Sequence, residues 1–369
     1  MKTVLFLIPT LGGGGAEKVL VNLVNALDRH KYSIEIKTLF SNDTNRRFIK
    51  SDTAYSSCFG KQFRGNRLLF KLFPPRILYR LLIGKRYDIV VSYLEGPTER
   101  IVAGCPYRDT KLINWIHVEQ HTLSVATASY RSAGEAYKCL NKFNATVCVS
   151  QTVKDDYRRL FTLNHPIKVC YNTNDIDAII KGAAEPLPQG VIPSGVNVIT
   201  VGRLTEAKGF DRLIKAHKRA LADGLHHNLL ILGDGSLKND LKDLAQSLGV
   251  NDTVYFLGFQ SNPYNYLSKA DLFVCSSRRE GFSTAVTEAL TLRVPVVSTL
   301  VSGAHELLGA NNEYGIVTDN TDEGLYQGLR QMLSDQSLLQ HYRRQAAIRA
   351  QKFSNENTVL AVEQLFDSL

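Results

Sequence analysis

The sequence has no run of apolar residues near the roughly 20 that a helix needs to cross a bilayer, although 44% of its 369 residues are hydrophobic. The first nine residues lead into Gly12–Gly15 rather than a small-residue cleavage site, so we interpret them as a strand, not a signal peptide. The six cysteines show no C-x-x-C spacing. This argues against a zinc or disulfide framework and fits a reducing cytoplasm.

Acidic residues are absent from Lys61–Arg86, where large apolar side chains alternate with cations and Pro74-Pro75 separates two short helical patterns. Residues 1–180 contain 26 Lys and Arg against 15 Asp and Glu, and residues 181–369 contain 18 against 20. One interpretation is a core-facing helix pair with a solvated basic face. Because the whole charge excess lies in this half, we favour an anionic membrane surface as partner, rather than nucleic acid. The cations are Lys61, Arg64, Arg67, Lys71, Arg76, Arg80, Lys85 and Arg86.

The length favours two domains, because single cores rarely exceed roughly 250–300 residues. Strand and helix patterns alternate on both sides of Lys181–Val196, a linker candidate with three prolines and three glycines. This alternation predicts an α/β protein with two Rossmann-like doubly wound parallel sheets, at 1–180 and 181–354, and a final helix at 355–369. Strands are expected near 3–9, 33–39, 89–92, 111–116, 146–150, 168–171, 197–201, 228–232, 253–257, 271–275 and 294–298. Helices are expected at 207–221, 237–248, 302–308, within 321–352, and at 355–369.

The glycine-rich turn at 12–15 joins the first strand to an amphipathic helix. It is not a dinucleotide fingerprint, because Glu17 stands where the third glycine belongs, and it is not a P-loop, because Lys18 follows Glu17. The turn remains open enough for a phosphate or sugar to approach the backbone. His117 ends the predicted strand 111–116, at the edge where parallel sheets bind ligands. A structural cap is the alternative for this histidine.

Two carboxylates eight positions apart, Glu280 and Glu288, bracket a predicted helix start, and Gly281 separates them. Amides of the first helical turn attract an anion there. A ligand with phosphate in the middle and hydroxyls at both ends fits this arrangement, as a nucleotide sugar does. Two solvated charges are the alternative. The amides in question belong to Phe282, Ser283 and Thr284.

Arg203 and Lys208 flank another strand-to-helix turn at the expected binding edge. A guanidinium and an ammonium together neutralise a diphosphate without a metal. They stabilise the charge of a departing nucleoside diphosphate. Two surface cations are the alternative. Asp175 and Asp177 form the only Asp-x-Asp pattern, and because no further ligands lie near them in sequence we expect no metal site.

These motifs together resemble the retaining GT-B glycosyltransferases of family 4, the E-x7-E glycosyltransferases. The resemblance covers nearly the whole chain, from the turn at 12–17 to Ser302–Glu306. It implies two domains facing across a cleft, with the last helix crossing back to the first domain. It also implies that Glu280 and His117 contact the donor sugar, that Arg203 and Lys208 hold the diphosphate, and that Glu288 holds the ribose. Further donor contacts would come from Gly14, Gly15, Gly281, Phe282, Ser283 and Thr284. The chain departs from the family at Ser283 and at Asn172–Asp175.

We therefore expect a metal-independent, retaining hexosyltransferase that uses a UDP-linked sugar as substrate and needs no cofactor. The expected acceptor is a polyprenyl-diphosphate-linked glycan of a bacterial surface polysaccharide, such as capsule or lipopolysaccharide. The expected location is the cytoplasm, peripheral on the inner face of the plasma membrane. Two alternatives remain open: a nucleotide-sugar 2-epimerase, whose added acid and base carboxylates we cannot assign, and a non-catalytic scaffold of the same fold.

Overall fold

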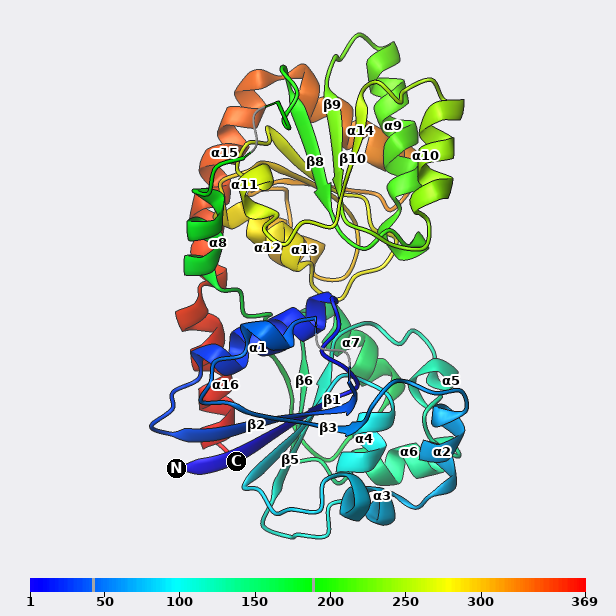
Figure 1. Cartoon of the computed structure of the whole chain (residues 1–369), viewed down its shortest axis with the longest axis vertical. Coiled ribbons are helices and arrows are strands. Elements are labelled where there is room, and N and C mark those ends of the chain that lie inside the picture. Colours follow the sequence, from blue (N-terminus) through cyan, green and yellow to red (C-terminus); the bar gives the residue numbers. More distant parts are fainter. Residues whose placement is uncertain (42–43, 188–189) are drawn as a thin grey trace. The chain divides into compact units, whose positions relative to one another are not determined.

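The computed structural model describes residues 1–41, 44–187 and 190–369. The chain forms two compact units. Unit 1 contains Met1–Thr173 together with Asn355–Leu369, and unit 2 contains Asn174–Ser354 (Figure 1). None of the helices in these described ranges is both long and apolar enough to span a bilayer.

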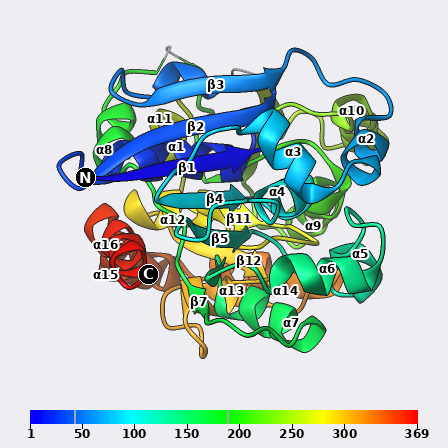
Figure 2. The same ribbon diagram turned by 90° about the horizontal axis from the view of Figure 1, so that it is seen from below.

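Unit 1 is built on a seven-stranded sheet in the order β3-β2-β1-β4-β5-β6-β7. All of its strand pairs are parallel, and Figure 2 shows β3, β2, β1, β4 and β5 side by side in that order. β3 was not predicted, because this edge strand is largely half-exposed and lacks a buried apolar stripe. The strands are β1 (Lys2–Ile8), β2 (Tyr32–Phe40), β3 (Ala54–Phe59), β4 (Ile89–Tyr93), β5 (Lys111–Ile116), β6 (Ala145–Cys148) and β7 (Ile167–Val169).

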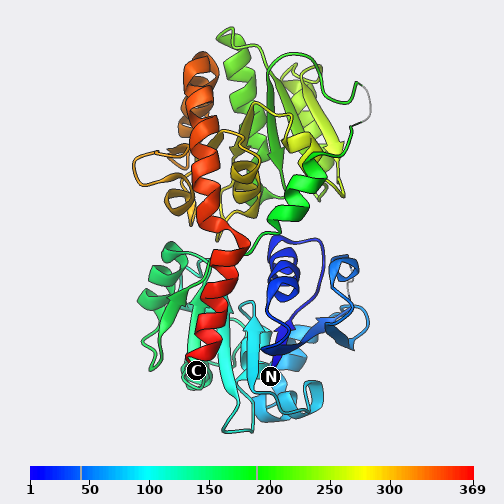
Figure 3. The same cartoon turned by 90° about the vertical axis from the view of Figure 1, so that its left-hand side faces the viewer.

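Helices connect these strands, and the two prolines at 74–75 separate α2 from α3 as predicted. The C-terminal helix α16 belongs to unit 1, as expected, and lies along it in Figure 3. Phe366 of α16 stacks edge-on against Tyr32 at 5.5 Å between ring centroids, and Glu363 accepts the Asp28 amide at 3.0 Å. The helices are α1 (Gly15–Ala26), η1 (Arg46–Phe48), α2 (Asn66–Leu72), α3 (Pro75–Leu82), α4 (Pro97–Val102), α5 (Leu123–Ala126), α6 (Ala133–Leu140), α7 (Gln151–Leu160) and α16 (Asn355–Asp367).

Unit 2 is built on a six-stranded parallel sheet in the order β10-β9-β8-β11-β12-β13. The two predicted Rossmann-like sheets are therefore confirmed. β13 was missed because three residues are too few to show a pattern. The strands are β8 (Asn197–Val201), β9 (Asn228–Leu232), β10 (Val254–Gly258), β11 (Leu272–Cys275), β12 (Val296–Thr299) and β13 (Ile316–Thr318).

The helix expected at 207–221 begins later, because Gly209 takes a left-handed backbone (φ +61°) between a short 3-10 turn and α9. The expected helical span 321–352 is divided at Asp335, which caps α15 through the amides of Ser337 and Leu338. The helices are α8 (Ile176–Ala183), η2 (Glu206–Lys208), α9 (Phe210–Ala222), α10 (Lys238–Ser247), α11 (Tyr264–Leu267), α12 (Thr284–Thr291), α13 (Ala304–Leu308), α14 (Asp322–Ser334), α15 (Gln336–Ala350) and η3 (Gln351–Phe353).

The division of the chain at Thr173 and Asn174 lies before the expected boundary at 180 and 181. The reason is that α8 packs against α11 and α12 of unit 2. Asn262 donates to the carbonyl of Gly182 at 2.8 Å and so ties the end of α8 to that unit. Part of the linker candidate Lys181–Val196, at 188–189, lies outside the described residues.

Each sheet has one point where its strand order reverses. In unit 2 the chain runs outward from β8 to β10 and then returns to place β11 on the other side of β8. In unit 1 the same reversal occurs between β1 and β4. Loops that leave neighbouring strands at such a point diverge and open a crevice at the carboxyl ends of the strands. The loops after β8 and β11, and those after β1 and β4, are therefore where a ligand site is expected in each unit.

Candidate active site

The loops after β8 and β11 carry the charged residues that the sequence singled out in unit 2. Lys208 ends the turn after β8, and Glu280 lies in the loop between β11 and α12. The Lys208 ammonium donates a hydrogen bond to Glu280 Oε1, so the two side chains form an ion pair. Residues 72 positions apart in the chain thus meet at the reversal point of the sheet.

The charge on Lys208 is kept by its partner. Burial lowers the pKa of the Lys208 ammonium, but the negative charge of Glu280 and the hydrogen bond to it outweigh burial and raise the pKa above its usual value. Lys208 is therefore protonated at neutral pH. Arg203 is close enough for its positive charge to oppose this rise. Its exposed guanidinium has no hydrogen-bond or ion-pair partner in the parts of the chain that the structure describes.

The two loops are in direct backbone contact. Gly209, directly after Lys208, approaches the next loop so closely that a Cβ there would lie 2.2 Å from the carbonyl oxygen of Ser276. Ser276 Oγ donates to the Lys208 carbonyl at 2.9 Å. The buried Arg212 of α9 donates to the carbonyls of Ser276 at 2.7 Å and Ser277 at 2.5 Å. These contacts fix the spacing between Lys208 and Glu280.

Helix α12 provides the rest of the predicted donor site. Ser283 is its N-cap residue, and its side chain makes no capping hydrogen bond. The amides of the first turn therefore keep their capacity for an anion, on the same loop as Gly281 and Glu280. Glu288 lies one turn further along α12, is only 4% exposed, and accepts a hydrogen bond from Tyr264 at 3.4 Å.

His117 and the glycine turn lie in unit 1, at the carboxyl edge of its sheet. His117 follows β5 and is only 6% exposed. Burial lowers the pKa of its imidazole to about 3, so the ring is neutral. Its Nε2 is buried without a hydrogen-bond partner among the described residues, so this nitrogen keeps its capacity for one hydrogen bond. Gly14 caps α1, and Gly15 is its first residue.

Three contributors around these residues had no usable signal in the sequence. Ser277 Oγ donates to Glu280 Oε1 at 2.7 Å, and Arg212 braces the same loop. Glu95 accepts the backbone amide of His117 at 3.0 Å and so fixes the start of that loop. In the sequence, the serine three positions before Glu280 is too common a pattern to indicate a contact between the two side chains. The other two act through tertiary contacts that composition and periodicity do not reveal.

A group of potential metal ligands occurs in unit 1, formed by Glu119, His121 and Asp156. Asp156 is already engaged, because it accepts the amides of Gln120 at 2.7 Å and His121 at 3.0 Å. It also pairs with Arg159 at 2.6 Å. The grouping is explained as an anchor for the loop after His117. Asp175 likewise serves as the N-cap of α8, accepting the Ala178 amide.

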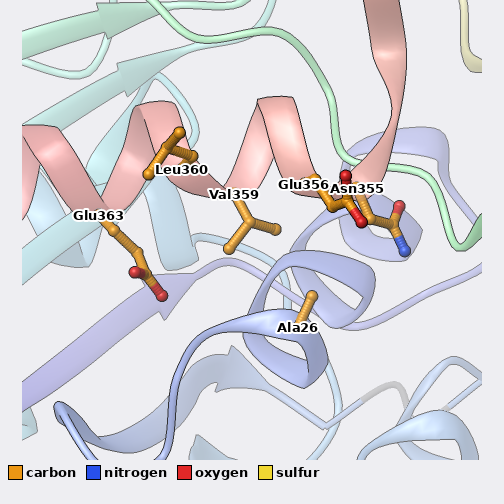
Figure 4. A pocket seen from close by; sticks show the side chains of 6 residues that line it. All are labelled: Ala26, Asn355, Glu356, Val359, Leu360 and Glu363. Atoms are coloured by element: carbon orange, nitrogen blue, oxygen red, sulfur yellow. The ribbon is translucent and has the colours of Figure 1, made fainter. Parts of the chain in front are cut away.

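A surface pocket lies between the end of α1 and the helix α16 (Figure 4). Glu363 in this pocket binds Lys31 at 2.9 Å and holds α16 on the unit. The pocket contains none of the predicted site residues. Its lining consists of Ala26, Asn355, Glu356, Val359, Leu360 and Glu363.

Comparison with protein families gives one answer for both halves of the chain. Residues 13–178 match the model described as Glycosyltransferase Family 4, and residues 190–349 match the model described as Glycosyl transferases group 1. The two matches leave only the ends of the chain and residues 179–189, a short segment within the sequence range of unit 2.

Two curated relatives illustrate the similarity. Over 188 residues the chain is 35% identical to N-acetylgalactosamine-N,N'-diacetylbacillosaminyl-diphospho-undecaprenol 4-alpha-N-acetylgalactosaminyltransferase of Campylobacter jejuni. This match covers 50% of the chain and 49% of that protein, so the chain spans about half the length of this relative. It is 28% identical to the lipopolysaccharide core biosynthesis glycosyltransferase LpsD of Rhizobium meliloti, over 88% of the chain and 86% of that protein.

Among solved structures, Anabaena HepE in complex with UDP and glucose has a TM-score of 0.80 and 19% identity, with both chains fully covered. At this identity the likeness shows the fold. It agrees with the two parallel sheets described above and with the two family models. The chain therefore belongs to the glycosyltransferases with the GT-B fold.

Proposed function

We propose that the chain is a retaining, metal-independent glycosyltransferase that moves a hexosyl group from a UDP-linked donor to an acceptor hydroxyl. The observation that carries this proposal is the ion pair between Lys208 and Glu280, with Arg203 beside it, at the reversal point of the unit 2 sheet. One protonated amine and one unpartnered guanidinium offer a diphosphate the two charges it needs. The adjoining carboxylate offers an acceptor for sugar hydroxyls.

The chemistry that follows is electrostatic. As the bond between the sugar and UDP breaks, negative charge accumulates on the diphosphate, and fixed cations and helix amides lower the energy of that state. Arg203 and Lys208 supply the cations, and the first turn of α12 supplies amides. We assign Glu288, one turn along the same helix, to the ribose hydroxyls. In unit 1, His117 is neutral, and its unpartnered Nε2 suits a hydrogen bond with a sugar hydroxyl.

Retention follows if the acceptor attacks from the face that the diphosphate leaves. A phosphate oxygen then takes the proton of the acceptor hydroxyl while the new glycosidic bond forms. No protein nucleophile is required. Glu280 is suited to binding sugar hydroxyls rather than to covalent attack, because Lys208 and Ser277 already bind one of its oxygens.

The test is incubation with a panel of UDP-sugars and acceptors, followed by detection of released UDP and of any changed sugar. We expect UDP release and a product with the donor's anomeric configuration. Lys208→Ala and Glu280→Ala should each lower turnover by about 100-fold or more, as for loss of a transition-state charge contact. Lys238→Ala is the matched control, because Lys238 forms an exposed ion pair with Asp234 in the same unit.

An isomerised nucleotide sugar without transfer would instead indicate an epimerase. Neither UDP release nor isomerisation across the panel would indicate a scaffold. Near-normal turnover of Glu280→Ala would contradict the proposed site. Full activity in excess EDTA is expected, since Arg203 and Lys208 take the place of a metal at the diphosphate.

The acceptor we propose is a polyprenyl-diphosphate-linked glycan used for a bacterial surface polysaccharide, at the cytoplasmic face of the membrane. The name of the Campylobacter relative, which contains diphospho-undecaprenol, supports this class of acceptor. The name of the Rhizobium relative, which refers to lipopolysaccharide core biosynthesis, supports a role in surface-polysaccharide assembly. A physical feature of unit 1 supports the membrane location.

That feature is the surface formed by α2 and α3 and the residues flanking them (Figure 1). Soluble monomers rarely expose large contiguous apolar areas, yet six large apolar side chains between 63 and 81 are 41–71% exposed. Cations are exposed among them, and an apolar face with basic neighbours suits an anionic lipid interface. The apolar residues are Phe63, Leu68, Leu72, Phe73, Ile77 and Leu81. The exposed cations are Lys61, Arg64, Arg76, Arg80, Lys85 and Arg86.

A buried arginine binds the backbone at the bend between α2 and α3. Arg100 is fully buried, donates to the carbonyls of Phe70 and of Phe73 (2.7 Å for Phe73) and pairs with Glu135 at 2.7 Å. Arg131 donates to the carbonyl of Lys71 at 2.6 Å. The outward position of the apolar side chains is therefore fixed by the fold.

Vesicle sedimentation tests this surface. We expect binding to vesicles containing phosphatidylglycerol and weak binding to phosphatidylcholine alone. Leu72→Ser with Leu81→Ser should reduce binding at least about 10-fold, since each buried leucine contributes roughly 1.5–3 kcal/mol. Ile348→Ser, at a 55% exposed residue of unit 2, is the control. Unchanged binding of the double variant would remove the physical basis for this part of the proposal.

A further inference from the structure

The carboxylate of Glu280 accepts hydrogen bonds through one of its two oxygens. Its Oε1 accepts from Lys208 Nζ and from Ser277 Oγ, the latter at 2.7 Å. Its Oε2 has no hydrogen-bond partner in the described parts of the chain. Two donors on one oxygen restrict rotation of the carboxylate and leave the second oxygen with a defined direction.

Ser277 is rigid enough to impose that direction. Its side chain is buried, and its carbonyl accepts from Arg212 at 2.5 Å and from Thr299 Oγ1 at 2.6 Å. The next residue, Arg278, forms two hydrogen bonds to Asp211 at 2.7 and 2.8 Å. Consecutive residues of α9, Asp211 and Arg212, therefore hold the loop just before Glu280.

Lys208 is less able to hold the carboxylate alone. Its ammonium lies at the end of four methylene groups and has three donors to share. A donor diphosphate would compete with Glu280 for those protons. The hydroxyl of Ser277 carries no charge and is bound to a rigid loop, so it remains on Oε1 when Lys208 turns toward phosphate.

We propose that Ser277 is a positioning residue: by donating to Glu280 Oε1 it directs Oε2 toward a hydroxyl of the donor sugar. This inference rests on the proposed transferase function and adds a residue to its donor site. It predicts that Ser277 affects recognition of the sugar and not of the nucleotide, because UDP lacks the group that Oε2 would contact.

The experiment compares Ser277→Ala with wild type on the UDP-sugar that supports turnover, and on UDP alone by calorimetry. Loss of one hydrogen bond to a charged group is expected to lower kcat/KM about 10-fold to 100-fold. The Kd for UDP and the thermal midpoint should stay close to the wild-type values. Ser247→Ala is the matched control, because the exposed Ser247 also makes one local hydrogen bond, to the Leu244 carbonyl at 2.8 Å.

A double-mutant comparison separates positioning from packing. In a Glu280→Ala background, where the oxygen that accepts from Ser277 is gone, Ser277→Ala should change kcat/KM by less than about 3-fold if the serine acts through Glu280. The inference is overturned if Ser277→Ala keeps full activity in an active enzyme. It is also overturned if the variant loses UDP binding or thermal stability in parallel with activity. A wild-type chain that transfers no sugar would instead refute the proposed function, and this inference with it.

Discussion

Gly209 is where the loop carrying Lys208 touches the loop carrying Glu280, and its replacement by alanine tests how much the site depends on that contact. The residue combines a left-handed backbone (φ +61°) with a close approach: a Cβ would lie 2.2 Å from Ser276 O and 2.8 Å from Arg212 Nε. Gly224 provides a matched control, since its φ is +80° and nothing lies within 4 Å of its Cβ position.

The magnitude has two parts. A left-handed backbone costs an alanine roughly 1–2 kcal/mol, which applies to both variants. Only Gly209→Ala adds the overlap with backbone atoms, and forced repacking costs about 1–3 kcal/mol more. The loops must also move apart by about 1 Å, which lowers turnover on the order of 100-fold when reacting groups are misplaced.

Urea unfolding and the UDP-release assay measure these two effects. Gly209→Ala should be less stable than Gly224→Ala by about 1–3 kcal/mol, from the overlap alone. It should lose most of its activity, while Gly224→Ala remains as active as wild type. Equal stability and equal activity of the two variants would refute the argument that the loops are held in register by this contact.

Three further outcomes are expected. The buried His217 and His227 bond each other at 2.8 Å, and burial lowers the pKa of His217 to about 3 and that of His227 below its usual value. Unfolded imidazoles bind protons below about pH 6.5, whereas these two stay neutral in the folded protein. The free energy of unfolding should therefore fall as pH drops from 7 to 4, by up to about 1.4 kcal/mol per pH unit per histidine. His217→Gln should make the free energy of unfolding, measured by urea titration, depend less steeply on pH. Arg100→Ala removes the side-chain ion-pair partner of Glu135, should lower the free energy of unfolding by about 3–5 kcal/mol, and should weaken vesicle binding. An unchanged thermal midpoint would contradict this role of Arg100. Dialysis against EDTA should leave UDP release unchanged, and a loss restored by Mg²⁺ would contradict metal independence.

Local chemistry made much of the fold predictable. Pro74 and Pro75 separate α2 from α3 as their lack of an amide donor requires. Alternating strands and helices predicted two parallel sheets, and the structure contains them. The predicted helix began at Ala207, two residues before Gly209, because helix propensity alone does not reveal the left-handed turn at Gly209.

The candidate site was predictable in its charges and not in its supports. Lys208 and Glu280 were named because cations and carboxylates at strand ends suggest phosphate and sugar chemistry. Ser277, Arg212 and Glu95 were missed, because their roles consist of hydrogen bonds to backbone and side chains that only the folded sheet brings together.

The most direct test of the account is calorimetric binding of UDP to the whole chain and to Lys208→Ala. If Lys208 and its neighbours form the donor diphosphate site, the variant should bind UDP at least about 10-fold more weakly, as for loss of a charged hydrogen bond. Lys238→Ala should bind UDP like the wild type. Equal UDP affinity in the wild type and Lys208→Ala would contradict the central claim.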